Sequence, residues 1–275
     1  YNYSVDVTAP GTNINATWTG NSYTQSSGTS MASPVCAGAA AIVRAFYPAY
    51  NALQAGQRLK TTTDNNYTGS NVLYIDKLGS GRINLYKALT DPTTGPSVIY
   101  ENKATTDNGD NAFVVGDTIR ITGDFKNYLA ATTNLTATLT AVSGGTFVTI
   151  LDGSTTPGVI NTLASVNHPA DPFQVKINAN APANQIVIFK LTLTDGAYTV
   201  NQYFSEVVNV DYINVTENLI GTSITSKGLI GYNLEQQQQG LGFTYNGSGS
   251  LLYEASLMIG KNSTTVSDMA RGATT

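Results

Sequence analysis

A hydroxyl-rich turn followed by a run of small apolar residues constrains this chain more than any other stretch. The turn covers residues 27–30, and the run continues to Val43. We expect Pro34 in the first turn of a helix, where its missing N–H does no harm. Because alanine and glycine occupy every face of that helix, we expect other segments to pack against its backbone from several sides. Ser30 then lies at the positive end of the helix dipole, where unpaired N–H groups can hold an oxyanion.

The sequence of this turn, Ser-Gly-Thr-Ser-Met-Ala-Ser-Pro, resembles the serine motif of the subtilisin-like serine proteases (subtilases), with Ser30 in the nucleophile position. Residues 5–11 resemble the strand and the Ala-Pro-Gly turn that precede this motif in the family. Residues 79–89 resemble the Gly-x-Gly-x-Ile-Asn segment that closes the peptidase domain. An isolated Ser-Gly-Thr-Ser is an ordinary turn, since glycine and serine are common in loops. Three signals in the family order make the match specific.

The resemblance implies peptide-bond hydrolysis through an acyl-enzyme on Ser30, with polypeptides as substrates. It also implies that a turn at Gly28 and Thr29 positions the serine and that the Ser30 N–H is one oxyanion donor. Subtilases carry an aspartate, a histidine and an asparagine before the serine, and none of these motifs precedes Ser30 here. We therefore expect the C-terminal part of a peptidase domain, which needs the missing N-terminal part as its partner. Alone, such a chain is expected to be inactive or nearly so.

Three other residues are candidates for chemistry. His168 is the only histidine, and its position between Asn167 and Pro169, after the serine motif, favours a surface loop residue over a catalytic base. Asp6 is the acidic residue nearest the serine motif, and we interpret it as an ordinary polar residue of a strand. Cys36 is the only cysteine, so no internal disulfide forms. Its place in the alanine-rich run favours a small buried hydrophobe over a reactive thiol.

The pattern of the chain divides it into three parts. Residues 1–91 are expected to be the C-terminal part of an α/β subtilisin-like domain, with two helices and an incomplete sheet. The elements expected there are an extended stretch over 13–17, a glycine-rich loop over 20–28, a helix ending near Pro48 and a second helix over 51–60. The resemblance implies that the helices pack on a parallel sheet whose other strands lie upstream. This part should therefore expose apolar surface.

Residues 91–96 read as a linker, after which hydrophobic and polar residues alternate, over 119–122, 135–141, 173–177, 186–194 and 198–208. Residues 92–210 are predicted to form an antiparallel immunoglobulin-like β-sandwich of about seven short strands. Asp195-Gly196 between two alternating runs is the strongest short hairpin signal. Residues 211–275 are predicted to be a truncated β-rich module, and the glutamine tract 236–239 is interpreted as a loop.

Composition limits the partners. Charged residues are 12% of the chain and the net charge is −4, which with the lack of a Lys/Arg run argues against nucleic-acid binding. We find no apolar run of 18 residues and predict no membrane span. The low charge favours a secreted, extracellular protein. The absence of a disulfide scaffold fits a bacterial secreted protein better than a small animal extracellular module. The alternative function is a non-catalytic extracellular binding or structural protein, with Tyr198, Tyr203 and Tyr212 supplying stacking faces.

One further segment raises the question of a cofactor. Residues 107–111, with Asp117 nearby, are rich in oxygen donors that calcium prefers. They lack the glycine and glutamate positions of a helix-loop-helix calcium site, and a solvated turn is the favoured interpretation. Calcium stays an open alternative, and no cofactor is assigned from the sequence.

Overall fold

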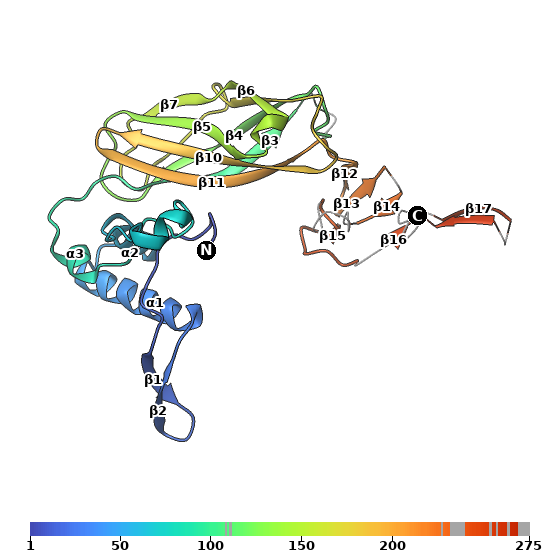
Figure 1. Cartoon of the computed structure of the whole chain (residues 1–275). Helices are drawn as coiled ribbons and strands as arrows, with labels where there is room; N and C mark the ends of the chain where they lie inside the picture. Colours follow the sequence, from blue (N-terminus) through green and yellow to red (C-terminus); the bar gives the residue numbers. More distant parts are fainter. Residues whose placement is uncertain are drawn as a thin grey trace.

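The structure is a computed structural model of the 275-residue chain, and it describes every residue except 108, 110–111, 227, 232–239, 253–254, 257, 263–264 and 269–275. Figure 1 shows the helices gathered in residues 1–90, which we call the N-terminal segment. Two antiparallel sheets follow in residues 98–208, the two-sheet unit. Further short strands lie beyond residue 211.

The N-terminal segment begins with a hairpin that projects from it (Figure 1). In the hairpin, β1 (Ile14–Trp18) pairs antiparallel with β2 (Ser22–Ser26). The extended stretch over 13–17 is thus confirmed, but the expected loop over 20–28 is wrong because much of it is strand. Both strands are mostly exposed, and β2, in which Tyr23 is flanked by polar residues, lacks the apolar and polar alternation that marks a half-buried strand.

The helices of this segment are α1 (Thr29–Phe46), α2 (Ala52–Thr61), α3 (Leu85–Thr90) and the 3-10 helix η1 (Gly69–Tyr74). The two helices expected from the sequence are confirmed, whereas α3 was not foreseen. At the start of α2 a capping box forms, because Asn51 Oδ1 accepts from Gln54 N at 2.9 Å while Gln54 Oε1 accepts from Asn51 N at 3.1 Å. In α1, Pro34 lies inside the helix rather than in its first turn. Its missing N–H removes the usual donor for the carbonyl of Ser30, four residues earlier.

Helix α1 contacts α2 and α3 on one side, around a small core of Ala39, Val43, Ala55, Leu59 and Ala88. The expected packing from several sides is therefore not found. On α1, Ile42 and Phe46 are 48% and 58% exposed, which confirms the expected exposure of apolar surface. In place of the expected sheet, the segment has a parallel bridge between Thr8 and Arg82 and an antiparallel one between Asp64 and Arg82.

Helix α1 is also the one helix, within the described part of the chain, that could cross a membrane by length and composition. Its mean hydropathy is 1.2 over 18 residues, contrary to the expectation that no such stretch exists. The core helix of a soluble protein passes the same test, so this property is weak support for a span.

The two-sheet unit consists of two antiparallel sheets around one core. One sheet has the order β11-β10-β5-β7 and the other β3-β4-β9-β6, with β8 paired to β4. Their bounds are β3 (Val98–Thr106), β4 (Thr118–Asn127), β5 (Leu135–Ser143), β6 (Val148–Asp152), β7 (Ser154–Gly158), β8 (Ser165–Asn167), β9 (Phe173–Ile177), β10 (Gln185–Asp195) and β11 (Tyr198–Val208), with the 3-10 helix η2 (Gly145–Phe147) before β6. Each alternating run named from the sequence is a strand.

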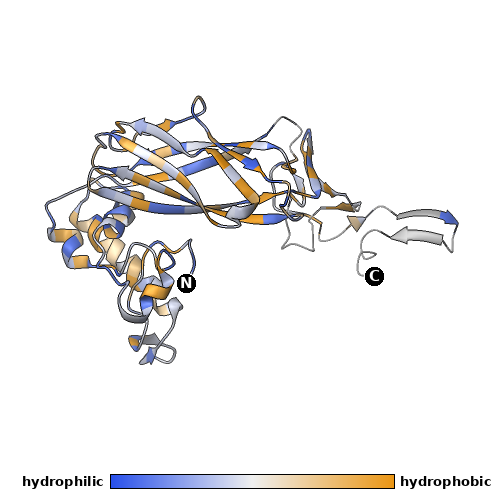
Figure 2. Ribbon diagram, turned by 45° about the horizontal axis from the view of Figure 1, so that its top comes forward, coloured by the Kyte–Doolittle hydropathy of each residue, from blue (hydrophilic) through white to orange (hydrophobic). Residues whose placement is uncertain are grey.

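Alternation along these strands directs one set of side chains into the core, as the banding in Figure 2 shows. Phe125 and Phe173 from one sheet and Phe189 and Leu191 from the other are fully buried in the same cluster. The hairpin signal at Asp195 is confirmed, because Asp195 pairs with Tyr198 across a two-residue turn. Gly196 adopts a positive φ of 59° in that turn, as a two-residue hairpin requires.

The free edge of β3 is covered by side chains of β11, from the other sheet. Tyr198 Oη accepts a hydrogen bond from Val98 N at 3.0 Å. The Gln202 amide accepts from Tyr100 N at 2.9 Å and donates to Val98 O at 2.9 Å. These bonds satisfy main-chain groups that an edge strand otherwise leaves open.

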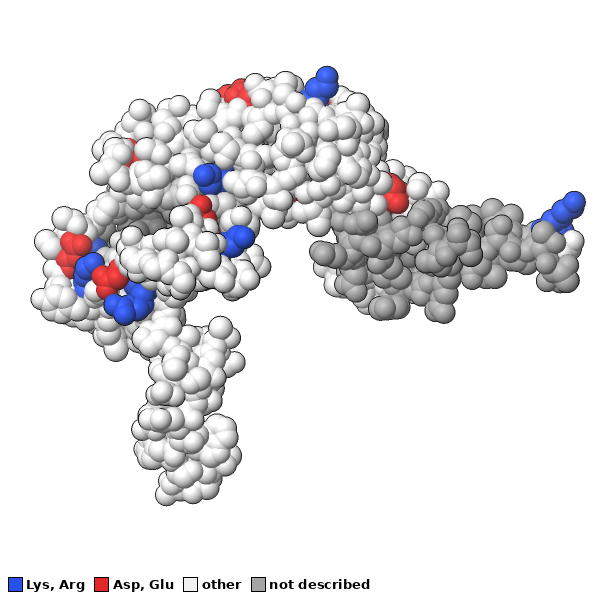
Figure 3. Space-filling view, in the orientation of Figure 1, with Lys and Arg blue, Asp and Glu red and all other residues white. Residues whose placement is uncertain are grey.

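The segment between α3 and β3 contains no helix or strand, as expected of a linker. Arg58 of α2 fixes the path of this segment. Its side chain is buried, with 1% exposure. The guanidinium donates to Ala88 O at 2.9 Å, to Thr93 O at 3.0 Å and to Asp91 O at 2.5 Å. Nearby, Asp64 accepts from Lys87 Nζ at 2.6 Å. Figure 3 shows that charged side chains gather over the helices of this segment.

Beyond the two-sheet unit the strands are β12 (Tyr212–Glu217), β13 (Ile220–Thr225), β14 (Leu229–Ile230), β15 (Phe243–Tyr245), β16 (Ala255–Ser256), β17 (Met258–Asn262) and β18 (Thr265–Asp268). They form antiparallel pairs, so this part is rich in β-strands as predicted. The glutamine tract lies outside the described residues. The division of the chain into three domains stays a prediction.

Candidate active site

Ser30 is exposed in the first turn of α1. The helix is capped by Gly28, whose φ of 152° and ψ of 170° are adopted readily by glycine alone. The Gly28 carbonyl accepts from Met31 N at 3.1 Å and from Ala32 N at 3.3 Å. Among the described residues, no hydrogen bond engages the N–H groups of Thr29 and Ser30. Such an end can hold an oxyanion beside a hydroxyl.

Two hydrogen bonds close the base of the hairpin and fix the turn that carries the serine. Gly28 N donates to Gly11 O at 2.7 Å, and Asn13 N donates to Ser27 Oγ at 2.9 Å. A Cβ at Gly11 would lie 2.8 Å from the Gly28 carbonyl oxygen and 3.2 Å from the Cβ of Ala32. The glycine of the Ala-Pro-Gly turn therefore lets two main-chain segments touch. The sequence marked this turn only as part of a motif and did not indicate its role.

The Gly-x-Gly segment packs against residues 6–8, where the strand expected from the resemblance is reduced to an isolated bridge at Thr8. Thr8 N donates to Gly81 O at 2.8 Å, and Ser80 N donates to Asp6 O at 2.9 Å. A Cβ at Gly79 would lie 2.3 Å from the carbonyl oxygen of Asp6, and both glycines have positive φ, 71° at Gly79 and 135° at Gly81. The three motifs, separated in sequence, are therefore joined through main-chain contacts.

Asp6 and Cys36 lie in this part of the chain. The carboxylate of Asp6 is 74% exposed and lies 2.6 Å from Lys60 Nζ at the end of α2. Cys36 is half-buried rather than fully buried as expected, and burial raises the pKa of its thiol. A raised pKa lowers the thiolate fraction at neutral pH, which fits a packing role.

His168 lies in the core of the two-sheet unit, so its interpretation as a surface loop residue is wrong. It is 6% exposed, and the rings of Phe125 and Phe173 lie 5.0 Å from its own. Nδ1 lies 3.0 Å from Asp171 O, which can only accept, so Nδ1 carries a proton. Nε2 lies 3.0 Å from Tyr100 Oη. Both nitrogens are engaged, and no described bond links the ring to Ser30. The sequence did offer one indication of this burial, because Val166, close to His168 in the chain, also packs on the core.

Two of the three tyrosines considered as stacking faces make contacts within the chain. Burial raises the pKa of Tyr198 to about 12, and its hydroxyl accepts from Val98 N. The ring of Tyr203 stacks on Tyr3 with centroids 4.5 Å apart. Tyr212 is half-buried at the start of β12. These positions give the alternative binding function little support.

The proposed calcium segment is only partly described, because residues 108, 110 and 111 fall outside the described part. Asp107 Oδ1 accepts from Gly109 N at 2.8 Å, and Asp117 Oδ2 accepts from Val114 N at 2.9 Å. In the described residues no three His, Cys, Asp or Glu side chains gather to hold a metal. Both described carboxylates thus bind main-chain groups of their own loops.

Comparison with known proteins gives a family match that is confined to the N-terminal segment. The sequence model of the subtilase family, peptidase family S8, matches residues 1–84. The thermostable alkaline protease of Halalkalibacterium halodurans is 43% identical over 88 residues, which are 32% of this chain and 23% of that protein. Subtilisin DY of Bacillus licheniformis is 42% identical over 84 residues, which are 30% of this chain and 28% of that protein.

Subtilisin BL of Lederbergia lenta is 40% identical over 84 residues, which are 30% of this chain and 29% of that protein. The chain thus spans less than a third of the length of these relatives. Among solved structures, a FixG-related protein from Vibrio parahaemolyticus has 14% identity and a TM-score of 0.24, with 42% of this chain and 95% of that chain covered. That score is too low to indicate a shared fold. The likeness to the subtilases, whose members are serine proteases, is therefore shown over residues 1–84 of the chain.

Proposed function

We propose that residues 1–84 carry the nucleophile of a subtilisin-like serine endopeptidase and that this nucleophile is Ser30. The observation that carries the proposal is the position of Ser30, exposed in the first turn of α1 beside two N–H groups without an acceptor in the described chain. The match of the surrounding 84 residues to the subtilase family supports it. Gly28 and Thr29 act as the turn that directs the hydroxyl.

In this reaction Ser30 Oγ attacks the carbonyl carbon of a peptide bond while a base takes its proton. The carbonyl oxygen becomes an oxyanion, which the Ser30 N–H stabilises. The amine leaves with a proton from the base, and water then hydrolyses the acyl-enzyme. His168 cannot serve as the base, because both of its ring nitrogens are engaged in the core of the two-sheet unit.

We therefore propose that the histidine, aspartate and asparagine used by subtilases come from polypeptide outside these 275 residues. The chain alone is then inactive or nearly so, because the members of a triad act as a unit. Residues 92–210 are proposed to be an immunoglobulin-like β-sandwich and residues 211–275 a separate β-rich module. Both follow the peptidase part in a secreted protein whose substrates are polypeptides.

A fluorophosphonate probe, which reacts with activated serines, tests the proposal. We expect labelling of Ser30 in protein that includes the upstream polypeptide, and none in the 275-residue chain. Ser30→Ala should abolish the labelling, whereas Ser33→Ala, one helical turn away and also exposed, should leave it unchanged. Labelling that survives Ser30→Ala would refute Ser30 as the nucleophile. Labelling of Ser30 in the isolated chain would refute the need for an external base.

A further inference from the structure

The N-terminal segment and the two-sheet unit touch at two separate patches, with open space between them. We propose that these two patches hold the parts in one fixed arrangement, so that the N-terminal segment docks both on the chain beside the start of β3 and the end of β4 and on the outward face of β11. The inference concerns binding between two parts of the chain and does not depend on the proposed activity. Domains joined by a linker are otherwise expected to move relative to one another.

The first patch, which we call the α2 patch, lies where α2 meets the start of β3 and the end of β4. Gln54 Nε2 donates to Tyr128 O at 3.0 Å, and Ser97 Oγ donates to Gln57 Oε1 at 2.8 Å. Gln54 and Ser97 are buried, 6% and 3% exposed. Buried polar groups of this kind are costly to separate from their partners unless water replaces them.

The second patch, the β11 patch, lies on the outward face of β11. The ring of Tyr203 stacks on Tyr3 with 4.5 Å between centroids and 28° between planes. Lys77 Nζ lies 5.0 Å from the centroid of Tyr3 on the N-terminal side. Asn201 Nδ2 donates to Asp76 Oδ1 at 3.3 Å. The pKa of Tyr203 is raised, chiefly by burial and secondly by the nearby carboxylate of Asp76.

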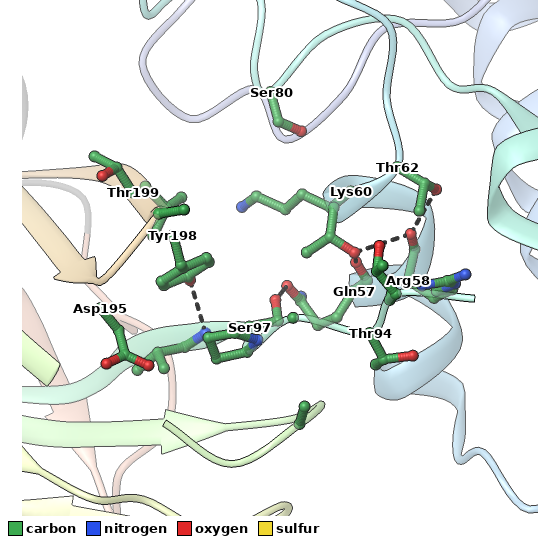
Figure 4. A pocket seen from close by; sticks show the side chains of 18 of the residues that line it. Gln57, Arg58, Lys60, Thr62, Ser80, Thr94, Ser97, Asp195, Tyr198 and Thr199 are labelled. Atoms are coloured by element: carbon green, nitrogen blue, oxygen red, sulfur yellow. Dashed lines mark hydrogen bonds between the residues drawn. The ribbon is translucent and has the colours of Figure 1, made fainter. Parts of the chain in front are cut away.

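Two adjoining cavities separate the patches. One, of about 750 Å³, is lined by Gln57 and Ser97 of the α2 patch. The other, of about 410 Å³, is lined by Tyr3, Asp76, Asn201 and Tyr203 of the β11 patch. Lys60, Ser80, Thr199 and Val200 line both, and Figure 4 shows Lys60 and Thr199 on opposite sides of the first cavity.

Two contacts separated by cavities give a mechanical argument for a fixed arrangement of the N-terminal segment and the two-sheet unit. A single contact beside the linker would allow the N-terminal segment to swing about it. A second contact beyond the cavities prevents that rotation, and the linker itself is held to α2 by Arg58. The segment held in this way includes residues 3–11, whose Gly11 accepts from Gly28 in the turn that carries Ser30.

The test separates the covalent connection from the two patches. A site for a specific protease is inserted between Thr94 and Gly95, which are both exposed in the linker, and the full chain is cut after folding. We expect the halves to stay together in size-exclusion chromatography at micromolar concentration. Halves that separate at every concentration, each with its secondary structure intact by circular dichroism, would overturn the proposal.

Substitutions then locate the binding. Tyr203→Ala should raise the dissociation constant of the cut halves about tenfold or more, because it removes a stacked aromatic contact. The matched control is Tyr86→Ala, since Tyr86 is 77% exposed on α3. If Tyr203→Ala prevents folding, Tyr3→Ala removes the same stack from the other side. If a folded variant of either tyrosine has the same dissociation constant as the control, the role of the β11 patch is refuted.

Discussion

Asp195 closes the β10–β11 hairpin and also binds the loop before β5, so its removal should be costly. Its carboxylate accepts from Thr133 N at 2.9 Å, from Thr133 Oγ1 at 2.6 Å and from Asn134 N at 2.7 Å. The residue is only 8% exposed. We expect Asp195→Ala to reduce the free energy of unfolding by about 3 kcal/mol, because three donors lose a charged acceptor and water reaches them poorly.

The same substitution should also change the dependence of stability on pH. Burial raises the pKa of Asp195, but the three hydrogen bonds outweigh burial and hold it below the ordinary value. A lowered folded-state pKa stabilises the protein above the unfolded-state pKa of about 3.9 and loses that contribution as the pH falls through the folded-state value. The difference in the free energy of unfolding between wild type and Asp195→Ala should therefore be constant from about pH 6 to 8 and shrink below about pH 4.

Urea unfolding followed by far-ultraviolet circular dichroism at several pH values measures both effects. The control is Asp171→Ala, because Asp171 is exposed and contributes only its main chain to a described bond. A loss for Asp195→Ala no larger than that of the control would refute the energetic argument. A difference that stays constant down to pH 3 would refute the assignment of the charge.

Two further predictions concern the N-terminal segment. Gly81→Ala should destabilise it by about 2 kcal/mol or more, since φ is 135° there and the new Cβ would lie 2.3 Å from Asp64 O. The control is Gly38→Ala, which has open space around it inside α1 and should be neutral or stabilising by up to about 1 kcal/mol. Equal melting temperatures for the two variants would contradict this prediction. Arg58→Lys should cost about 2 kcal/mol in urea unfolding, because one ammonium group cannot reach the three carbonyls that the guanidinium binds; an unchanged midpoint would contradict that reading.

The sequence predicted best where physical signals were local and strong. The alternation around Phe173 and Leu191 and the turn at Gly196 led to correct strands, because buried strands must direct every second side chain inward. The helix after Ser30 was also foreseen, though its start and the place of Pro34 were not. The start of this helix depends on contacts with residues distant in sequence, such as the hydrogen bond from Gly28 N to Gly11 O.

Other features depend on partners that a single sequence does not reveal. The burial of His168 follows from Tyr100 and Asp171, which supply both of its hydrogen bonds. The small residues of α1 predicted close packing on all faces, yet Ile42 is 48% exposed. Ser30, which the motif places at the start of this run, is exposed there, and its role as the nucleophile stays a proposal.

The covering of the β3 edge has a consequence for contacts between neighbouring β units. Main-chain groups of Val98 and Tyr100 are occupied by Tyr198 and Gln202 of the same unit. A neighbouring molecule that offers an extended strand would have to displace these side chains before it could pair with Val98. Several such units can therefore lie close together without their sheets joining at this edge.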